Sequence, residues 1–305
     1  MNKKKYTSSL LLLLAAIVWG FAFAAQDAAS EMGAFTLGFA RSLIAGVFLI
    51  GVVLVFDKAS VSGRKLFSRR GIDLNRYEIV GGVIIGAVLV VASAFQQIGI
   101  NNGTDGGKAA FITALYVILV PIYALALKKK AALNVWISIA IAVVGFYLLC
   151  IKEDLTVAPS DVLVIIASMI FPIHILTIDH FSPKCDGIRM SMVQFFTAAV
   201  LNLVIALITE GPAELGAIFP CILPVLYLGI GSSGIAYTLQ IIGQKDVPPA
   251  TASIILSLES VFGIIGTALF LGQTLTPREY LGCAVVLVAV LLSQIDISQI
   301  IRAKT

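Results

Sequence analysis

Charged side chains are scarce in this sequence. Asp, Glu, Lys and Arg make up 12% of the 305 residues, about half the share found in a typical soluble domain. Apolar residues make up 59%. A soluble domain of this size would need a far more polar surface, so the composition excludes that class and predicts an integral membrane protein.

Cysteine and histidine are also few, with four and two residues. Cys150, Cys185, Cys221 and Cys283 are widely separated and lack the spacing of metal ligands. We interpret them as packing residues and predict neither a metal nor a cofactor.

Nucleotide-binding motifs are missing as well. The segment GTDGGKA at residues 103–109 resembles a phosphate loop, but its spacing is wrong and Ala109 follows the lysine. The segment GSSG at 231–234 lies within an apolar run, where small residues are typical of close helix packing. The sequence therefore gives no sign of transport driven by ATP.

Long apolar runs are abundant, and short polar breaks separate them. They do not alternate as the strands of a membrane barrel would, so they predict an all-α integral membrane protein. We expect ten transmembrane helices, at residues 8–26, 35–55, 79–100, 108–127, 133–151, 162–178, 191–208, 219–242, 250–271 and 280–296.

The basic residues alternate with these helices. With a cytoplasmic N-terminus, 17 of the 21 Lys and Arg fall in cytoplasmic segments, and only Lys108, Lys152 and Arg278 fall outside, with Arg41 inside a helix. Positive charge favours the cytoplasmic side. We therefore predict a multi-pass protein of the cell membrane with both termini in the cytoplasm.

The first helix raises an alternative. Lys3–Lys5, an apolar run and the small residues around Ala22 and Ala24 are also typical of a cleaved signal peptide. Because this segment takes part in the internal repeat described next, we interpret it as a retained helix.

The chain resembles itself at a shift of 143 residues, which brings Gly86 onto Gly229 and Gln97 onto Gln240. A shift of 152 brings the first helix onto the sixth. These matches predict two five-helix repeats, residues 1–151 and 152–305. Five is odd, so the second repeat is inverted in the membrane, as in many secondary transporters.

Such transporters bind their substrate near the midplane, often where related helices are interrupted by Gly or Pro. Trp19-Gly20 overlays Phe171-Pro172, and we expect the interruptions there. Tyr116 overlays Glu259 in the same way. These positions predict one site between the repeats.

Four segments of the chain form a recognisable pattern: AAIVWGFAF, FARSLIAGVFL, AAFITALYVILVPIYALALKKK and LSLESVFGIIGTALFLGQTLTPREYLGCAVVLVAVLL. Together they resemble the drug/metabolite transporter superfamily, EamA-type branch. Ser260 and Gln273 depart from the family pattern, which usually has Pro and Glu there. The resemblance implies ten helices in two inverted repeats and movement of small metabolites, amino acids or amines, most often outward.

Glu259 is the strongest candidate site residue. A carboxyl group at the middle of a membrane helix costs about 2.5 to 3.5 kcal/mol, which predicts a substrate or proton-coupling site. The alternative is a neutral acid hydrogen-bonded to another helix. Trp19 and Tyr116 would place ring faces beside an organic cation. Phe171 is a further candidate contact, although aromatic residues also pack membrane cores.

Four other polar residues allow two interpretations each. Arg41 either extends to the outer interface or binds a substrate carboxylate. Gln97 and Gln240 are either gates at opposite mouths or interhelical hydrogen-bonding residues. His174 either has a role in the site or donates to a backbone carbonyl that Pro172 leaves free.

The sequence thus predicts a secondary active transporter of a small organic solute that works by alternating access. Export is the favoured direction. Uptake of an amine-like or zwitterionic nutrient is the alternative, and a non-transporting membrane assembly protein ranks lower. An intramembrane enzyme is disfavoured, because few ionisable groups converge. The expected partners are the solute, the lipid bilayer, and protons or another coupling ion; a homodimer stays open and nucleic acid is not expected.

Overall fold

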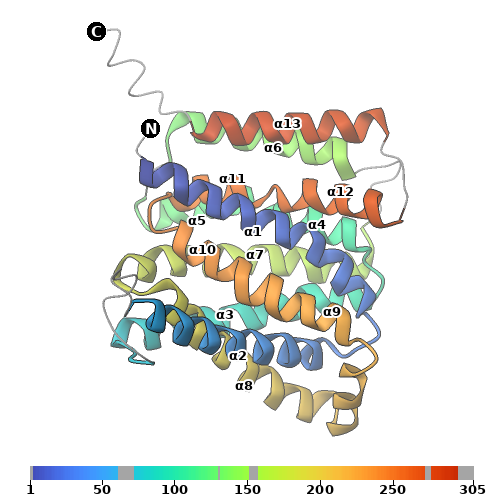
Figure 1. Ribbon diagram of the computed structural model, residues 1–305. Coiled ribbons are helices and arrows are strands. Elements are labelled where there is room, and N and C mark those ends of the chain that lie inside the picture. The colour runs from blue at the N-terminus through green and yellow to red at the C-terminus, as the bar shows by residue number, and fades with distance from the viewer. Residues whose placement is uncertain (1–2, 61–71, 130, 151–156, 272–275, 295–305) are drawn as a thin grey trace.

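The chain folds almost entirely into helices. The computed structural model describes residues 3–60, 72–129, 131–150, 157–271 and 276–294, and no strand occurs among them. Within these described ranges, nine helical stretches are long and apolar enough to span a membrane, and Leu133–Leu148 is a shorter apolar one. The all-helical membrane architecture is therefore confirmed (Figure 1).

The elements are α1 (Lys3–Ala28), α2 (Ala34–Ser60), α3 (Arg76–Asn101), α4 (Gly106–Ala114), α5 (Tyr116–Ala126), α6 (Leu133–Cys150), α7 (Pro159–Phe181), η1 (Ser182–Lys184), α8 (Gly187–Thr209), η2 (Pro212–Ile218), α9 (Ile222–Leu226), the π-helical η3 (Tyr227–Tyr237), α10 (Thr238–Gly243), α11 (Pro249–Leu256), α12 (Glu259–Leu271) and α13 (Pro277–Gln294).

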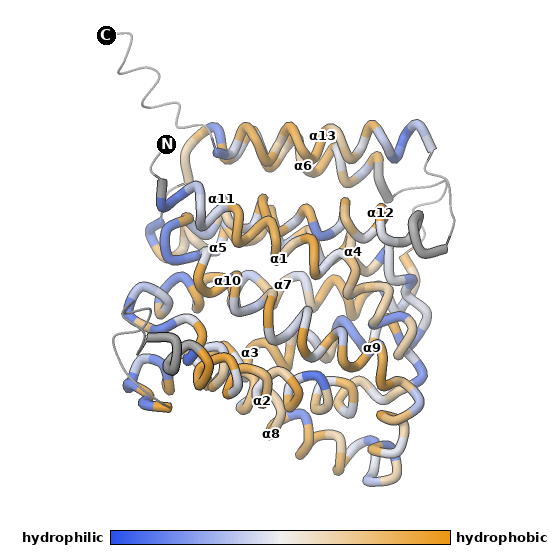
Figure 2. The backbone as a smooth tube through the Cα atoms, viewed as in Figure 1, coloured by the Kyte–Doolittle hydropathy of each residue, from blue (hydrophilic) through white to orange (hydrophobic). Residues whose placement is uncertain are grey.

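Hydrophilic residues gather at the two ends of the helices, and apolar residues fill the length between them (Figure 2). Large apolar side chains also face outward. Val200, Val204 and Ile208 on α8 are 61%, 51% and 77% exposed. Outward apolar faces between two polar ends suit a protein whose sides contact lipid chains.

Helices from the two halves of the chain pack in matched pairs. The fifth span, α6, packs on the tenth, α13, and the second, α2, packs on the seventh, α8. The third, α3, packs on the sixth, α7, and α1 packs on the eighth span, formed by α9, η3 and α10. These are the pairs that a two-fold relation between two five-helix halves brings together. The predicted boundary at residues 151–152 lies outside the described residues.

Two glycines 143 residues apart show the same relation in detail. A Cβ atom on Gly86 would lie 2.6 Å from the backbone oxygen of Gln194 in α8. One on Gly229 would lie 3.3 Å from the backbone oxygen of Arg41 in α2 and still closer to a side chain there. Both positions thus let two helices approach closely. Because the backbone oxygens of Gln194 and Arg41 make these equivalent contacts, we call the two residues counterparts.

Two spans are interrupted, and the interruptions also lie 143 residues apart. The fourth span breaks at Leu115, between α4 and α5, and the ninth breaks at Leu258, between α11 and α12. Each of these leucines donates its N–H to the carbonyl three residues earlier, at 3.2 Å in both cases. This tighter pairing is typical of a strained or hinge position within a helix.

The predicted site of interruption was wrong, because α1 and α7 run unbroken through Gly20 and Pro172. Gly20 serves a different purpose. A Cβ atom there would lie 2.5 Å from the Cβ of Phe262 and 2.8 Å from the backbone oxygen of Glu259. The glycine therefore lets α1 contact the ninth span beside its break.

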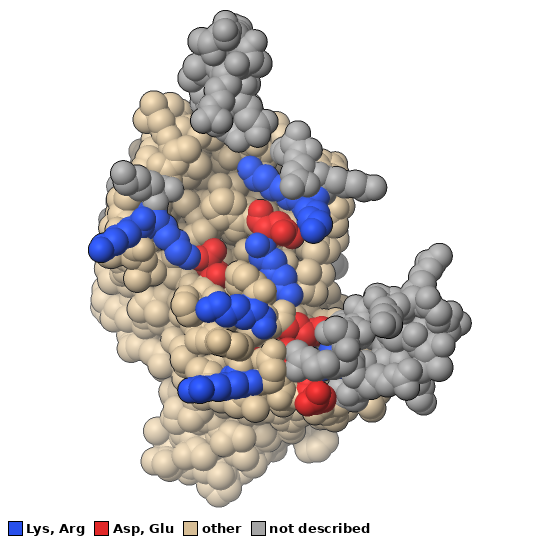
Figure 3. Space-filling view, turned by 90° about the vertical axis from the view of Figure 1, so that its left-hand side faces the viewer, with Lys and Arg blue, Asp and Glu red and all other residues tan. Residues whose placement is uncertain are grey.

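Basic side chains gather on the face where α1 begins, which we call the basic face (Figure 3). We call the opposite end the far face. Among the described residues, those at helix ends on the basic face include Lys4, Lys5, Arg76, Lys128, Lys129, Lys184 and Lys245.

The cysteines pack as expected where they are described. Cys185, Cys221 and Cys283 lie in or against apolar clusters, and none forms a disulfide. The side chain of Cys150 and the whole of Gln273 lie outside the described residues.

Candidate functional site

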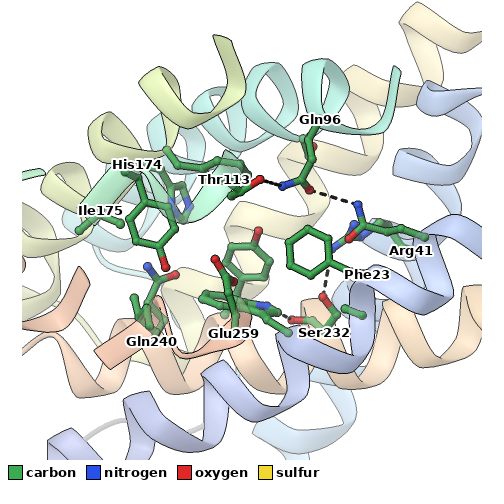
Figure 4. A pocket seen from close by; sticks show the side chains of 17 residues that line it. Phe23, Arg41, Gln96, Thr113, His174, Ile175, Ser232, Gln240 and Glu259 are labelled. Carbon is green, nitrogen blue, oxygen red and sulfur yellow. Dashed lines mark hydrogen bonds between the residues drawn. The ribbon is translucent and has the colours of Figure 1, made fainter. Parts of the chain in front are cut away.

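A pocket opens where the matched halves meet. It is lined by residues from seven of the ten spans (Figure 4). Both interrupted spans contribute to its wall. The lining residues are Trp19, Ala22, Phe23, Gln26, Arg41, Ser93, Gln96, Thr113, Tyr116, Phe171, His174, Ile175, Ser232, Tyr237, Gln240, Leu256 and Glu259.

Tyr116 and Glu259 are each the first residue after a helix break, at equivalent places in the two halves. Their side chains are 4% and 5% exposed. In the described structure, the hydroxyl of Tyr116 and Oε1 of Glu259 are buried without a close hydrogen-bond partner, and the two side chains lie within reach of each other. A buried polar atom of this kind is costly, which suits a group that binds a ligand or proton.

The break before Glu259 has a local cause. The hydroxyls of Ser253 and Ser257 donate to the carbonyls of Ala250 and Ile254, three residues earlier. Such side-chain bonds compete with the helical backbone and bend it. Ser260 in turn donates to the carbonyl of Ala110 at 3.0 Å and ties the ninth span to the fourth.

Arg41 points into the pocket. Its Nε donates to the hydroxyl of Ser233 at 3.0 Å, and its Nη2 donates to the hydroxyl of Ser232 at 3.2 Å. Both serines belong to η3 of the eighth span. Of the two interpretations of Arg41, the geometry therefore favours the pocket over the outer interface.

Aromatic rings form one wall beside these charges. Trp19 donates its Nε1–H to the backbone oxygen of Ser232 at 3.2 Å and meets Tyr237 edge to face, with ring centroids 4.6 Å apart. Phe171 also lines the pocket. These rings leave apolar surface for the body of a ligand.

His174 lies in the pocket wall, 1% exposed, and its ring meets that of Tyr237 edge to face at 5.7 Å. Its Nε2 has no hydrogen-bond partner among the described residues. Both interpretations of His174 therefore stay predictions.

A hydrogen-bonded cluster lies at the far-face end of the pocket. Gln26 donates to the Oε1 atoms of Gln96 and Gln97, both at 3.1 Å. Gln96 donates to Thr113 at 2.8 Å, as Figure 4 shows, and Gln97 donates to Asn101 at 2.8 Å. These bonds join the first, third and fourth spans.

Gln97 and Gln240 occupy equivalent positions but differ in their surroundings. Gln97 is used in the cluster of the far-face end and does not line the pocket. Gln240 lines the pocket, and its Oε1 has no partner in the described structure. A gating role for either residue stays a prediction.

Sequence reasoning missed Ser232, Ser233, Gln26, Gln96 and Thr113. The segment GSSG was interpreted as a packing surface, and Gly234 does fit that role, since a Cβ there would lie 2.7 Å from Phe48. The signal that could have revealed the serines was the presence of an arginine within an apolar helix, which needs acceptors at the same depth. Among the described residues, no group of three or more His, Cys, Asp or Glu could hold a metal ion.

Comparison with known proteins agrees with this architecture. The sequence pattern of the EamA-like transporter family matches residues 7–151 and again residues 158–294. The chain belongs to the EamA-like transporter family. It is thus a multi-pass membrane transporter, and the resemblance noted in the sequence is confirmed.

Two further proteins resemble this EamA-like transporter along nearly all its length. An uncharacterized transporter of Archaeoglobus fulgidus is 26% identical over 291 residues, which cover 95% of this chain and 86% of the relative. A protein of known crystal structure superposes with a TM-score of 0.72 at 15% identity, covering 95% of this chain and 96% of the other. At that identity, the second likeness supports the fold alone.

Proposed function

We propose that this protein is a secondary active transporter that exports a small organic solute. The observation that carries the proposal is the pocket between the two halves, where both interrupted spans meet and where the carboxyl group of Glu259 and the guanidinium of Arg41 both line the wall. A binding site at the interface of two related halves suits alternating access, in which one half rocks against the other.

The proposed direction and orientation rest on two features. The gathering of Lys and Arg on the basic face supports a cytoplasmic position for that face and for both termini. Outward movement is supported by the resemblance to EamA-type transporters. Because the sequence has no nucleotide-binding motif, we propose that an ion gradient or the solute's own gradient drives the movement.

Glu259 is the proposed coupling residue, which binds either the solute or a proton during the cycle. Its carboxyl group lies at a helix break in the pocket, so movement of α11 against α12 would change its surroundings. Gly20, which contacts the backbone at this break, would transmit movement of α1 to it.

The test is flux in proteoliposomes, with oriented protein and a panel of amino acids, amines and nucleobases. We expect Glu259→Gln to remove at least nine-tenths of coupled flux, because the amide cannot carry the charge, whereas Glu31→Gln, an exposed control, should leave it unchanged. Normal coupled flux in Glu259→Gln would refute the coupling role. Absence of any flux in the wild type would favour the non-transporting assembly protein.

A further inference from the structure

Two ion pairs join the fourth span to the sixth, one near each face of the protein. At the far face, Nζ of Lys108 in the first turn of α4 lies 2.5 Å from Oδ2 of Asp161 in the first turn of α7. At the basic face, Lys129, which follows α5, pairs with Asp179 near the end of α7. The fourth span belongs to the first half of the chain and the sixth to the second. Both ion pairs therefore cross the interface between the halves.

The pocket lies between the two ion pairs along this contact, which we call the latch seam. Thr113 and Tyr116 of the fourth span and His174 of the sixth line the pocket. The fourth span is broken at Leu115, so α4 and α5 are separate segments, and both pack on α7. Because of this break, either segment can move away from α7 while the other stays in place.

We infer that the two ion pairs are alternating latches. Lys108–Asp161 closes the pocket toward the far face, Lys129–Asp179 closes it toward the basic face, and each breaks when the pocket opens on its side. This inference rests on the proposed function, because rocking of one half against the other separates the latch seam at one face at a time. The lysine side chains are 41% and 46% exposed, and ion pairs with an exposed partner are weak enough to break in every cycle.

The two latches differ in strength. Asp161 is 2% exposed, and it also accepts hydrogen bonds from the backbone N–H of Ala158 at 2.8 Å and from the hydroxyl of Thr104 at 3.0 Å. Asp179 is more exposed, at 14%. Hydrogen bonds to a buried carboxylate are stronger than those to a solvated one. We therefore expect the far-face latch to hold longer, so that the pocket opens more often to the basic face.

The related seam, between the ninth and first spans, is held in a different way. The residues 143 positions after Lys108 and Lys129 are Thr251 and Gly272, which carry no charge and cannot form the equivalent ion pairs. The backbones approach closely there instead, since a Cβ atom on Gly263 would lie 3.4 Å from the backbone oxygen of Gly20. Close packing near mid-depth suits the side about which the halves turn. The latch seam is then the side that opens.

The test measures access to the pocket from each face and needs no solute. Ser93 lines the pocket, and Ser93→Cys is a small change, so this cysteine is the reporter in a chain whose four native cysteines are replaced by alanine. The probe is 2-(trimethylammonium)ethyl methanethiosulfonate, a charged thiol reagent, added to right-side-out or to inverted membrane vesicles. The ratio of the far-face to the basic-face labelling rate reports which side of the pocket is open.

The two latches should shift this ratio in opposite directions. Lys108→Ala should raise it about five-fold, and Asp179→Asn should lower it about five-fold, which is the upper range for an ion pair with an exposed partner. Opposite shifts are expected because both latches bias one equilibrium between two states. The charge-swapped chain, Lys129→Asp with Asp179→Lys, should restore the original ratio.

The matched control is Arg278→Ala. It removes a far-face cation of α13, which is not among the helices that line the described pocket, and it should leave the ratio unchanged. An unchanged ratio in Lys108→Ala and Asp179→Asn would overturn the inference. So would equal increases of both rates, which indicate general loosening, or a charge swap that fails to restore the ratio. Asp179 lies near the surface, so its variants keep the test decisive if Lys108→Ala does not fold.

The two proposals can fail separately. Opposite shifts of the labelling ratio without flux of any solute would retain the latches and overturn the proposed function. Solute flux in a protein whose labelling ratio ignores both ion pairs would overturn the latches and leave the transporter standing.

Discussion

The two halves of the chain share their scaffold but differ at the pocket. Gly86 and Gly229 make equivalent close contacts, yet the neighbouring counterparts Arg41 and Gln194 are treated differently. Ser232–Ser233 accept hydrogen bonds from Arg41, whereas the residues 143 positions earlier, Leu89–Val90, offer Gln194 no side-chain acceptor. Gln194 is fully buried, and in the described structure both polar atoms of its side chain are without a close hydrogen-bond partner, although His174 lies within reach.

This difference separates two kinds of position. Where the counterparts match, as at the glycines and the helix breaks, the residues hold the halves together. Where they differ, as at Tyr116 and Glu259, each half gives the pocket a polar group that the other half lacks at that position. The predictions below test this division.

The largest effect is expected at the shared scaffold. Gly86→Val and Gly229→Val would each force atoms into a space where a Cβ already lies 2.6 Å from its neighbour. Each should lower the free energy of unfolding by about 3 kcal/mol through overpacking. Thermal unfolding in detergent checks this, with Gly51→Val as the control because nothing lies within 4 Å of a Cβ there. A large loss at only one of the two glycines would break the proposed equivalence.

The second effect concerns the half that carries Arg41. The double variant Ser232→Ala and Ser233→Ala removes two acceptors from a guanidinium within the pocket, which should cost about 2 kcal/mol of stability. The corresponding change of Leu89→Ala is a cavity control, because it removes apolar volume and no acceptor. Solute affinity should fall in the serine variant and remain in the control. A serine variant with unchanged stability and affinity would show that these hydroxyls do not position Arg41.

The third effect distinguishes the two equivalent glutamines. Gln97→Met breaks hydrogen bonds with Gln26 and Asn101 and should cost about 1 kcal/mol of stability. Gln240→Met removes an oxygen that has no partner and should leave stability nearly unchanged while weakening solute binding. Equal losses of stability in both variants would contradict the difference between the two ends of the pocket.

Much of the fold could be predicted because membrane spans leave a direct record in the sequence. The apolar runs and their polar breaks matched the helices within a few residues, since the bilayer fixes their length. The helix breaks were misplaced because the expected signals, Gly20 and Pro172, mark close packing and an unbroken helix. The true breaks follow Ala114 and Leu256, where neither glycine nor proline occurs.

The pocket was predicted less completely. Glu259 was identified because a carboxyl group within an apolar run is conspicuous, and Tyr116 because the 143-residue shift overlays it on Glu259; both line the pocket. Ser232 and Thr113 were missed because these helices are apolar on all sides. Their sequences therefore do not show which face turns inward, and only packing against other helices decides it. The roles of all these residues stay predictions.

The smallest effect should have the opposite sign and tests the counterpart of Arg41. Gln194→Met replaces an unpartnered amide with an apolar side chain of similar length, in surroundings that offer no side-chain acceptor at Leu89–Val90. Removing an unsatisfied buried group should raise the free energy of unfolding by up to about 1 kcal/mol. Arg41→Met, measured beside it, should lower solute affinity instead. A lower melting temperature for Gln194→Met would mean that the amide has a partner in the working protein, and that both members of this pair serve the pocket.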